Sequence, residues 1–214
     1  CYFANNTAGV NGGAIDWHNG AENGRVNNTV FIDNTAKRSG GAIYWYGHNG
    51  TILSSNFTDN KALGSTYAVN PDGENVTGGD GGAVLWTGDL GTVDDCIFKF
   101  NTADKRGGAV FLRGTGEATC MDTSFTNSKF INNTAGTNGG AIDWNKGAQN
   151  GIIDNTVFID NTAKRSGGAV FWYGYNGTIR NSNFTHNYAL GVNNATSVMG
   201  EVTYGGDGGA VIWT

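Results

Sequence analysis

The chain has 214 residues, 36 of them glycine and one proline, and a formal net charge of −5. This glycine content is too high for an ordinary globular core, and 12% aromatic residues argue against a disordered linker. The mild acidity argues against nucleic-acid binding, and no run of about 18 apolar residues predicts a membrane span. Both ends fall inside a repeated pattern, so we expect a fragment of a longer protein whose targeting signals lie elsewhere.

One motif recurs along the whole chain: Phe-x-x-Asn-x-Ala, a short bridge, and Gly-Gly-Ala-(Ile/Val)-x-Trp. A clear copy and its counterpart 127 residues later are Phe31, Asn34, Gly40, Gly41, Trp45 and Phe158, Asn161, Gly167, Gly168, Trp172. Gly-Gly-Ala begins at Gly12, Gly40, Gly81, Gly107, Gly139, Gly167 and Gly208. The spacings 28, 41, 26 and 32 restart after 127 residues. We therefore predict one repeat domain, residues 1–214, with a superrepeat of 127 residues.

Each unit contains three short apolar runs bounded by Gly, Asn or Ser, which is typical of short strands. In chain order, one set of runs covers residues 29–31, 42–45 and 51–53. No segment has the apolar spacing of a helix, and the many Gly and Asn residues disfavour helices. Three strands and three turns per unit predict an all-β fold, a parallel β-helix of about seven coils stacked about 4.8 Å apart.

In such a stack, equivalent residues of successive coils lie above one another. We predict that the repeat Phe, Ile and Trp point inward, as do the small residues two positions before each Phe. The residue between Ile and Trp is predicted to point outward as an apolar strip, which the inserted loops cover in an alternative interpretation. This outward file consists of Asp16, Tyr44, Leu85, Phe111, Asp143, Phe171 and Ile212.

Three further features of the scaffold follow from the repeat. The repeat Asn is predicted to take left-handed backbone angles at a corner and to form an amide ladder, and the Gly pair to turn the chain tightly. The fourth coil carries both Phe125 and Phe130, and the sequence leaves open which of them keeps the standard corner. Cys1, Cys96 and Cys120 fit inward files and are predicted to be buried free thiols.

The pairing of Phe-x-x-Asn with Gly-Gly-Ala-(Ile/Val) resembles the polymorphic membrane proteins of chlamydiae. It also resembles the adhesin-like surface proteins of gut methanogenic archaea and of some of their viruses. The resemblance covers the whole chain through seven paired motifs. It implies a right-handed parallel β-helix on a cell or virion surface, with an adhesive role, and it transfers no catalytic residues. A membrane would be reached only through an anchor outside this sequence.

Two insertions interrupt the repeat, at residues 61–78 and 188–205, and they differ from each other more than the scaffold does. Long loops on a rigid scaffold often carry binding residues, although unconstrained loops also drift. The ligand contacts predicted from these loops and the nearby aromatic residues are Tyr67, Asp72, Asn194, Met199, Tyr44, Tyr46, Phe171 and Tyr173.

Other chemistry is sparse. Asp80 and Asp207 recur in Gly-Gly-Asp-Gly-Gly-Ala and are candidate Ca²⁺ ligands, with a turn-forming role as the alternative; no other cofactor is predicted. The pairs Lys37-Arg38, Lys105-Arg106 and Lys164-Arg165 suit either a solvated rim or an anionic glycan.

The sequence thus predicts a non-enzymatic, extracellular adhesin module on a cell or virion surface. Its expected partner is a glycan or protein on another cell, and nucleic acid is not expected. A polysaccharide lyase or hydrolase on the same scaffold is one alternative, with clustered carboxylates as acid, base or Ca²⁺ ligands. A purely structural stalk is the other.

Overall fold

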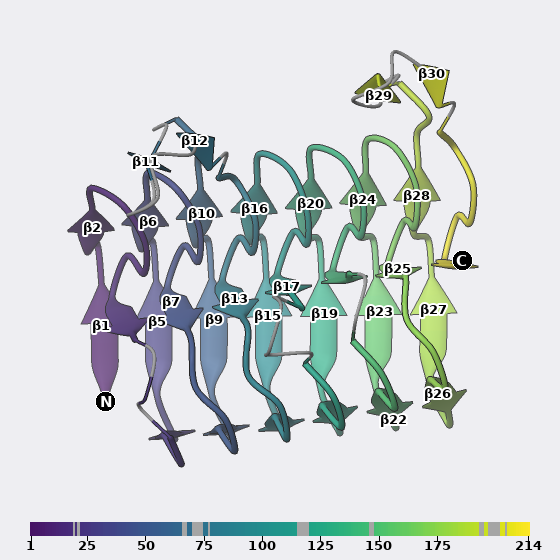
Figure 1. The fold of residues 1–214 in the computed structure, drawn as a ribbon. Coiled ribbons are helices and arrows are strands. Elements are labelled where there is room, and N and C mark those ends of the chain that lie inside the picture. The colour runs from purple at the N-terminus through teal and green to yellow at the C-terminus, as the bar shows by residue number, and fades with distance from the viewer. Residues whose placement is uncertain are drawn as a thin grey trace.

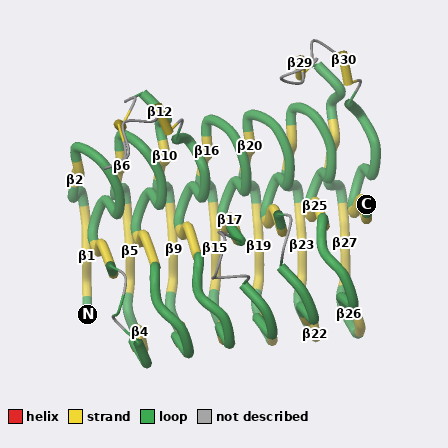
Figure 2. Tube along the Cα trace, in the orientation of Figure 1, coloured by secondary structure: helices red, strands yellow, loops and turns green. Residues whose placement is uncertain are grey.

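The computed structural model describes residues 1–18, 20, 22–65, 68–69, 75–76, 78–114, 120–145, 148–192, 195–196, 202–203 and 205–214. These residues form an all-β parallel solenoid in which the chain winds through four sheets, and the N- and C-termini lie at opposite ends of the stack (Figure 1). Figure 2 shows only strands and loops in the described part of the chain.

Each turn passes through sheets D, A, B and C in that order, and all neighbours within these sheets are parallel. Sheet A contains β1 (Tyr2–Ala4), β5 (Val30–Ile32), β9 (Asn56–Thr58), β15 (Ile97–Lys99), β19 (Lys129–Ile131), β23 (Val157–Ile159) and β27 (Asn183–Thr185). Sheet B contains β2 (Thr7–Ala8), β6 (Thr35–Ala36), β10 (Lys61–Ala62), β16 (Thr102–Ala103), β20 (Thr134–Ala135), β24 (Thr162–Ala163) and β28 (Tyr188–Ala189).

Sheet C contains β3 (Ile15–Trp17), β7 (Ile43–Trp45), β13 (Val84–Trp86), β17 (Val110–Leu112), β21 (Ile142–Trp144), β25 (Val170–Trp172) and β31 (Val211–Trp213). Sheet D contains β4 (Arg25–Asn27), β8 (Thr51–Leu53), β14 (Thr92–Asp94), β18 (Ser124–Thr126), β22 (Ile152–Asp154) and β26 (Thr178–Arg180). The predicted seven coils are thus a first pass through A, B and C followed by about six turns.

The prediction of three strands per coil is wrong, because the Thr-Ala pair that follows each repeat Asn is a strand of its own. These two-residue strands form sheet B, in register from coil to coil, as in the pairing of Lys61-Ala62 with Thr102-Ala103. Two residues are too few to show a periodicity of two, so the sequence pattern does not reveal them. Each coil therefore turns four corners instead of three.

A left-handed residue stands at each of these corners, but the repeat Asn does not supply it. At the corner between sheets A and B the positive φ belongs to the preceding residue: Asn5, Asp33, Asp59, Phe100, Asn132, Asp160 and His186. The first glycine of each pair, such as Gly40 with φ of 67°, provides it between sheets B and C. The prediction of left-handed angles at the repeat Asn is therefore wrong, and that Asn is selected for its side chain.

The predicted amide ladder is confirmed. The Asn34 Nδ2 donates to Asn60 Oδ1 at 2.9 Å, and the Asn60 Nδ2 donates in turn to Asn101 Oδ1 at 3.0 Å. The same Oδ1 atoms accept from backbone amides, as Asn101 Oδ1 does from the Asn60 amide at 3.1 Å. The ladder runs from Asn6 to Asn187 and satisfies buried polar groups that the corner would otherwise leave unpaired.

Stacked aromatic rings fill the interior. The seven repeat Phe rings, from Phe3 to Phe184, lie nearly parallel with centroids 4.6–5.0 Å apart. Phe130 stacks on Phe98 and Phe158 and pairs with them in sheet A, so it keeps the standard corner. Such offset stacks add to the free energy gained from burying the rings.

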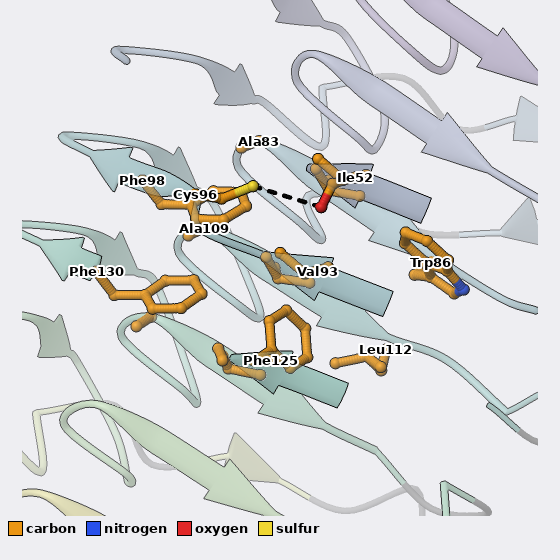
Figure 3. Packing of buried hydrophobic residues seen from close by; sticks show 14 of the residues in the cluster. Ile52, Ala83, Trp86, Val93, Cys96, Phe98, Ala109, Leu112, Phe125 and Phe130 are labelled. Carbon is orange, nitrogen blue, oxygen red and sulfur yellow. Dashed lines mark hydrogen bonds between the residues drawn. The ribbon is translucent and has the colours of Figure 1, made fainter. Parts of the chain in front are cut away.

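The fourth coil exchanges two core volumes. Leu112 takes the place of a Trp, and Phe125 takes the place that Val93 and Ile153 hold in neighbouring coils. The Phe125 ring packs edge-on against Trp144, with centroids 5.4 Å apart. Figure 3 shows Phe125, Leu112 and Val93 in the same part of the interior. The larger Phe fills space that the smaller Leu leaves, which keeps the core close-packed.

The three cysteines are free thiols, as predicted, but only Cys96 and Cys120 are buried. Cys120 also lies outside the inward file assigned to it, because Phe125 occupies that position. Burial raises the pKa of the Cys96 thiol to about 12 and raises that of Cys120 as well. Because the thiolate is the reactive form, we expect iodoacetamide at pH 8 to modify Cys1 alone in the folded protein.

Mass spectrometry of the intact protein measures this directly. One adduct is expected under native conditions and three after unfolding in guanidinium chloride. Rapid native modification of Cys96 or Cys120 would contradict the buried placement of these thiols.

Candidate binding face

The middle residue of each sheet C strand points away from the core. The first and third residues, such as Ile43 and Trp45, belong to the buried hydrophobic cluster, and the middle residue, Tyr44, does not. Since successive side chains on a strand alternate between faces, the middle residues define the outer face of sheet C. The predicted orientation of Ile and Trp is thus confirmed.

The predicted continuous exposed strip along this face is wrong. Leu85, Phe111 and Asp143 are at most 1% exposed. Tyr44, Phe171 and Ile212 are half-buried, and Asp16 is exposed. The outer face is therefore covered over its middle coils and accessible toward both ends. The sequence pattern gave the side to which each residue points and could not give the cover, which depends on neighbouring coils.

An ion pair lies over the middle of the face. Arg106 donates through Nε and Nη2 to the two carboxylate oxygens of Asp80, each at 2.9 Å. The same guanidinium lies over the Phe111 ring, with Cζ 4.3 Å from the centroid. A bidentate, largely buried pair of this kind fixes the position of both side chains. Asp80, a predicted Ca²⁺ ligand, is thus neutralised by arginine, while Asp207 is exposed.

Asp143 is a second buried carboxylate on this face, and neither of its oxygens has a hydrogen-bond partner. Burial raises its pKa to about 8, the nearby Arg106 lowers it, and Asp80 raises it further. The sequence analysis placed Asp143 outward and missed its burial, along with the roles of Arg106 and Asn138. A signal was present, because Asn-Gly-Gly-Ala-Ile-Asp-Trp occurs both at 11–17 and at 138–144.

The two insertions leave the solenoid at the same corner, between sheets B and C. The Ser65 and Gly79 amides donate to the Lys37 and Arg38 carbonyls, and Val192 and Gly206 repeat this with Lys164 and Arg165. The insertions begin later than predicted, since Lys61–Ala62 and Tyr188–Ala189 are regular strands of sheet B.

Each insertion contains a short antiparallel pair, β11 (Ala68–Val69) with β12 (Asn75–Val76) and β29 (Ala195–Thr196) with β30 (Val202–Thr203). Figure 1 shows both pairs projecting beyond sheet B from the same edge of the solenoid. Of the predicted contacts, Tyr67, Asp72, Asn194 and Met199 lie outside the described residues.

The remaining predicted contacts fall into two separate groups. Tyr44 and Tyr46 lie at β7, and Phe171 and Tyr173 lie at β25, with β13, β17 and β21 between them in the sheet. Tyr173 is 40% exposed and the nearby Tyr175 is 73% exposed. Burial raises the pKa of Tyr44, and Arg113 and Arg38 lower it. The structure therefore presents two aromatic groups, one in each copy of the superrepeat.

The basic pairs divide between solvent and the covered face. Lys37 and Lys164 are exposed, whereas Arg38, Lys105 and Arg165 are half-buried. Arg106, which lies directly before Gly107, is held by Asp80. Within the described residues, no group of three or more His, Cys, Asp or Glu side chains is placed to hold a metal ion. The described part of the chain also contains no helix long and apolar enough to cross a membrane.

The fold and the repeated face define a repeat protein of the parallel β-solenoid class. Four segments, residues 1–16, 28–44, 123–143 and 155–171, match the model of the Chlamydia polymorphic membrane protein (Chlamydia_PMP) repeat. Each matched segment covers strands of sheets A and B and reaches sheet C. This repeat is found in a family of autotransporter-type surface proteins, which is consistent with a surface protein. Comparisons with curated proteins and with solved structures found no match.

Proposed function

We propose that this chain is a non-enzymatic adhesion module of an extracellular protein on a cell or virion surface. It binds a glycan or protein of another cell through the aromatic groups of sheet C and the two hairpin insertions. The observation that carries the proposal is the duplication of this arrangement. The same hairpin and a similar aromatic group recur 127 residues apart, on a scaffold whose repeat matches a family of surface proteins.

The arrangement suits contact with an extended partner. Tyr173 and Tyr175 expose ring surface that stacks on sugar rings or packs on protein side chains, at low cost in conformational entropy. Two weak sites on one rigid rod raise the affinity for a repetitive ligand, because the second binding event is intramolecular. The rigid stacking of coils fixes the separation of the two sites.

Substitution of the exposed aromatics tests the proposal. The double variant Tyr46→Ala/Tyr173→Ala is expected to lower binding to cells or to a glycan array at least about tenfold, because two contact groups are lost. Tyr188→Ala is the matched control, since Tyr188 is 51% exposed but lies on sheet B. Deletion of residues 66–77 and 193–204 tests the insertions separately. Unchanged binding in all of these variants would refute an adhesive role for this region.

The two other functions give different results in the same experiments. A polysaccharide lyase or hydrolase releases unsaturated products or new reducing ends from a polysaccharide panel. A purely structural stalk binds none of the cells or glycans tested, and only the length of the chain matters to it. The duplicated aromatic groups favour binding over both alternatives.

A further inference from the structure

Asp143 is a buried carboxylate without a protein partner. It is 1% exposed, and both of its oxygens lack a hydrogen bond. Leaving such a charge uncompensated costs several kcal/mol, so a buried carboxylate normally pairs with a cation, binds a metal or takes up a proton. The nearest cationic group, Arg106, already directs two donors to Asp80. The three side chains together therefore retain one uncompensated negative charge.

A second acceptor without a partner lies beside this carboxylate. Asn138 Oδ1 is buried and unpaired. Asn138 precedes the glycine pair of its coil as Arg106 does one coil earlier, and Asp143 pairs with Phe111 in sheet C. The Arg106 guanidinium lies 4.3 Å from the Phe111 ring centroid, so the repeat places the Asn138 side chain next to Asp143. Three oxygen acceptors thus gather at one place.

The same pair of residues recurs in the first copy of the superrepeat. Asn11 and Asp16 occupy the equivalent positions in an identical heptapeptide. Asn11 Oδ1 is also buried without a partner. Burial raises the pKa of Asp16, and His18 lowers it. A packing fault confined to one coil would not be repeated, so the arrangement is a property of the repeat.

We propose that Asn138 and Asp143 bind a small, hard metal cation such as Ca²⁺ on the outer face of sheet C. Asn138 Oδ1 and the two Asp143 oxygens are the side-chain ligands. Ca²⁺ takes about six to eight oxygen ligands, so backbone carbonyls and water complete its coordination. One cation gives all three oxygens a partner and compensates the buried charge. This site differs from the one that the sequence predicts at Asp80 and Asp207.

Thermal unfolding of the complete 214-residue chain, followed by circular dichroism, tests this proposal. The protein is first treated with EDTA and dialysed, and CaCl2 is then added to about 5 mM. We expect the Tm to rise by about 5 °C, since a ligand bound only by the folded state stabilises it. Tb³⁺ is expected to give sensitised luminescence through Trp144, the residue after Asp143.

Two variants and one control complete the test. Asp143→Asn is expected to fold and to lose both the Tm response and the Tb³⁺ signal. Asn138→Ala, which removes one ligand, is expected to raise the Ca²⁺ concentration at half-maximal response about tenfold, and it serves if Asp143→Asn does not fold. Asp95→Asn is the control, because Asp95 is an exposed acid at another corner.

Two results would overturn the proposal. An unchanged Tm of the wild-type protein in CaCl2, without Tb³⁺ luminescence, means that a proton alone neutralises Asp143. An equal response of wild type and Asp143→Asn means that the cation binds elsewhere.

Discussion

Replacing Gly41 with alanine is expected to destabilise the protein by about 3 kcal/mol or more. Gly41 is the second glycine of its pair, and a Cβ there would lie 1.9 Å from the Gly82 carbonyl oxygen and 2.6 Å from the Lys61 amide nitrogen. Both are backbone atoms of the next coil, so a side-chain rotation cannot relieve the clash. The same contact of 1.9–2.1 Å recurs at Gly13, Gly82, Gly108, Gly140 and Gly168.

Urea denaturation followed by circular dichroism measures this loss. Gly9→Ala is the matched control, because no heavy atom lies within 4 Å of a Cβ built there and its φ is not positive. We expect that control to change the free energy of unfolding by less than about 0.5 kcal/mol. Equal stability of Gly41→Ala and the wild-type protein would show that the coils separate more easily than their packing indicates.

Replacing Asn101 with alanine is expected to cost about 4 kcal/mol, because it cuts the amide ladder in its middle. Asn101 Oδ1 accepts from the Asn60 amide and from Asn60 Nδ2. Asn101 Nδ2 donates to the Phe57 carbonyl and to Asn133 Oδ1, each at 3.0 Å. Alanine leaves these partners buried without a hydrogen bond, and each such group costs about 1–3 kcal/mol.

Asn56→Ala in the same coil serves as the control. Asn56 is an exposed residue of β9, so its amide meets water in either case. We expect the urea midpoint of Asn101→Ala to fall well below that of Asn56→Ala. Similar midpoints would mean that water replaces the ladder at little cost, in conflict with the full burial of Asn101.

Much of the fold follows from the spacing of a few residue types. Phe31 and Trp45 recur with a coil of nearly constant length between them, and stacking then places like on like, which predicts the core and the Asn34 ladder. The two-residue strands of sheet B escape this reasoning because a pair such as Thr35-Ala36 carries no alternation. The left-handed residue was assigned one position too late, because Asn34 has the right propensity and Asp33 has the right place.

The candidate site was less accessible to sequence reasoning. The pattern gave the outward direction of Tyr44 and Phe171, and the structure places each of them at an accessible part of the outer face. It did not separate Asp16, which is exposed, from Asp143, which occupies the same position in the repeat and is buried. The two share their own coil sequence, and they differ in the coil that packs against them.

The sequence by itself determined the solenoid, because stacking of equivalent coils turns a periodic sequence into continuous columns of Phe, Trp and Asn side chains. Only the tertiary structure decided which surface positions are buried. Burial on the outer face of sheet C depends on side chains that neighbouring coils place there, such as Arg106 over Phe111. Those neighbours are set by the superrepeat, whose coils differ on the outer face while their interiors stay alike.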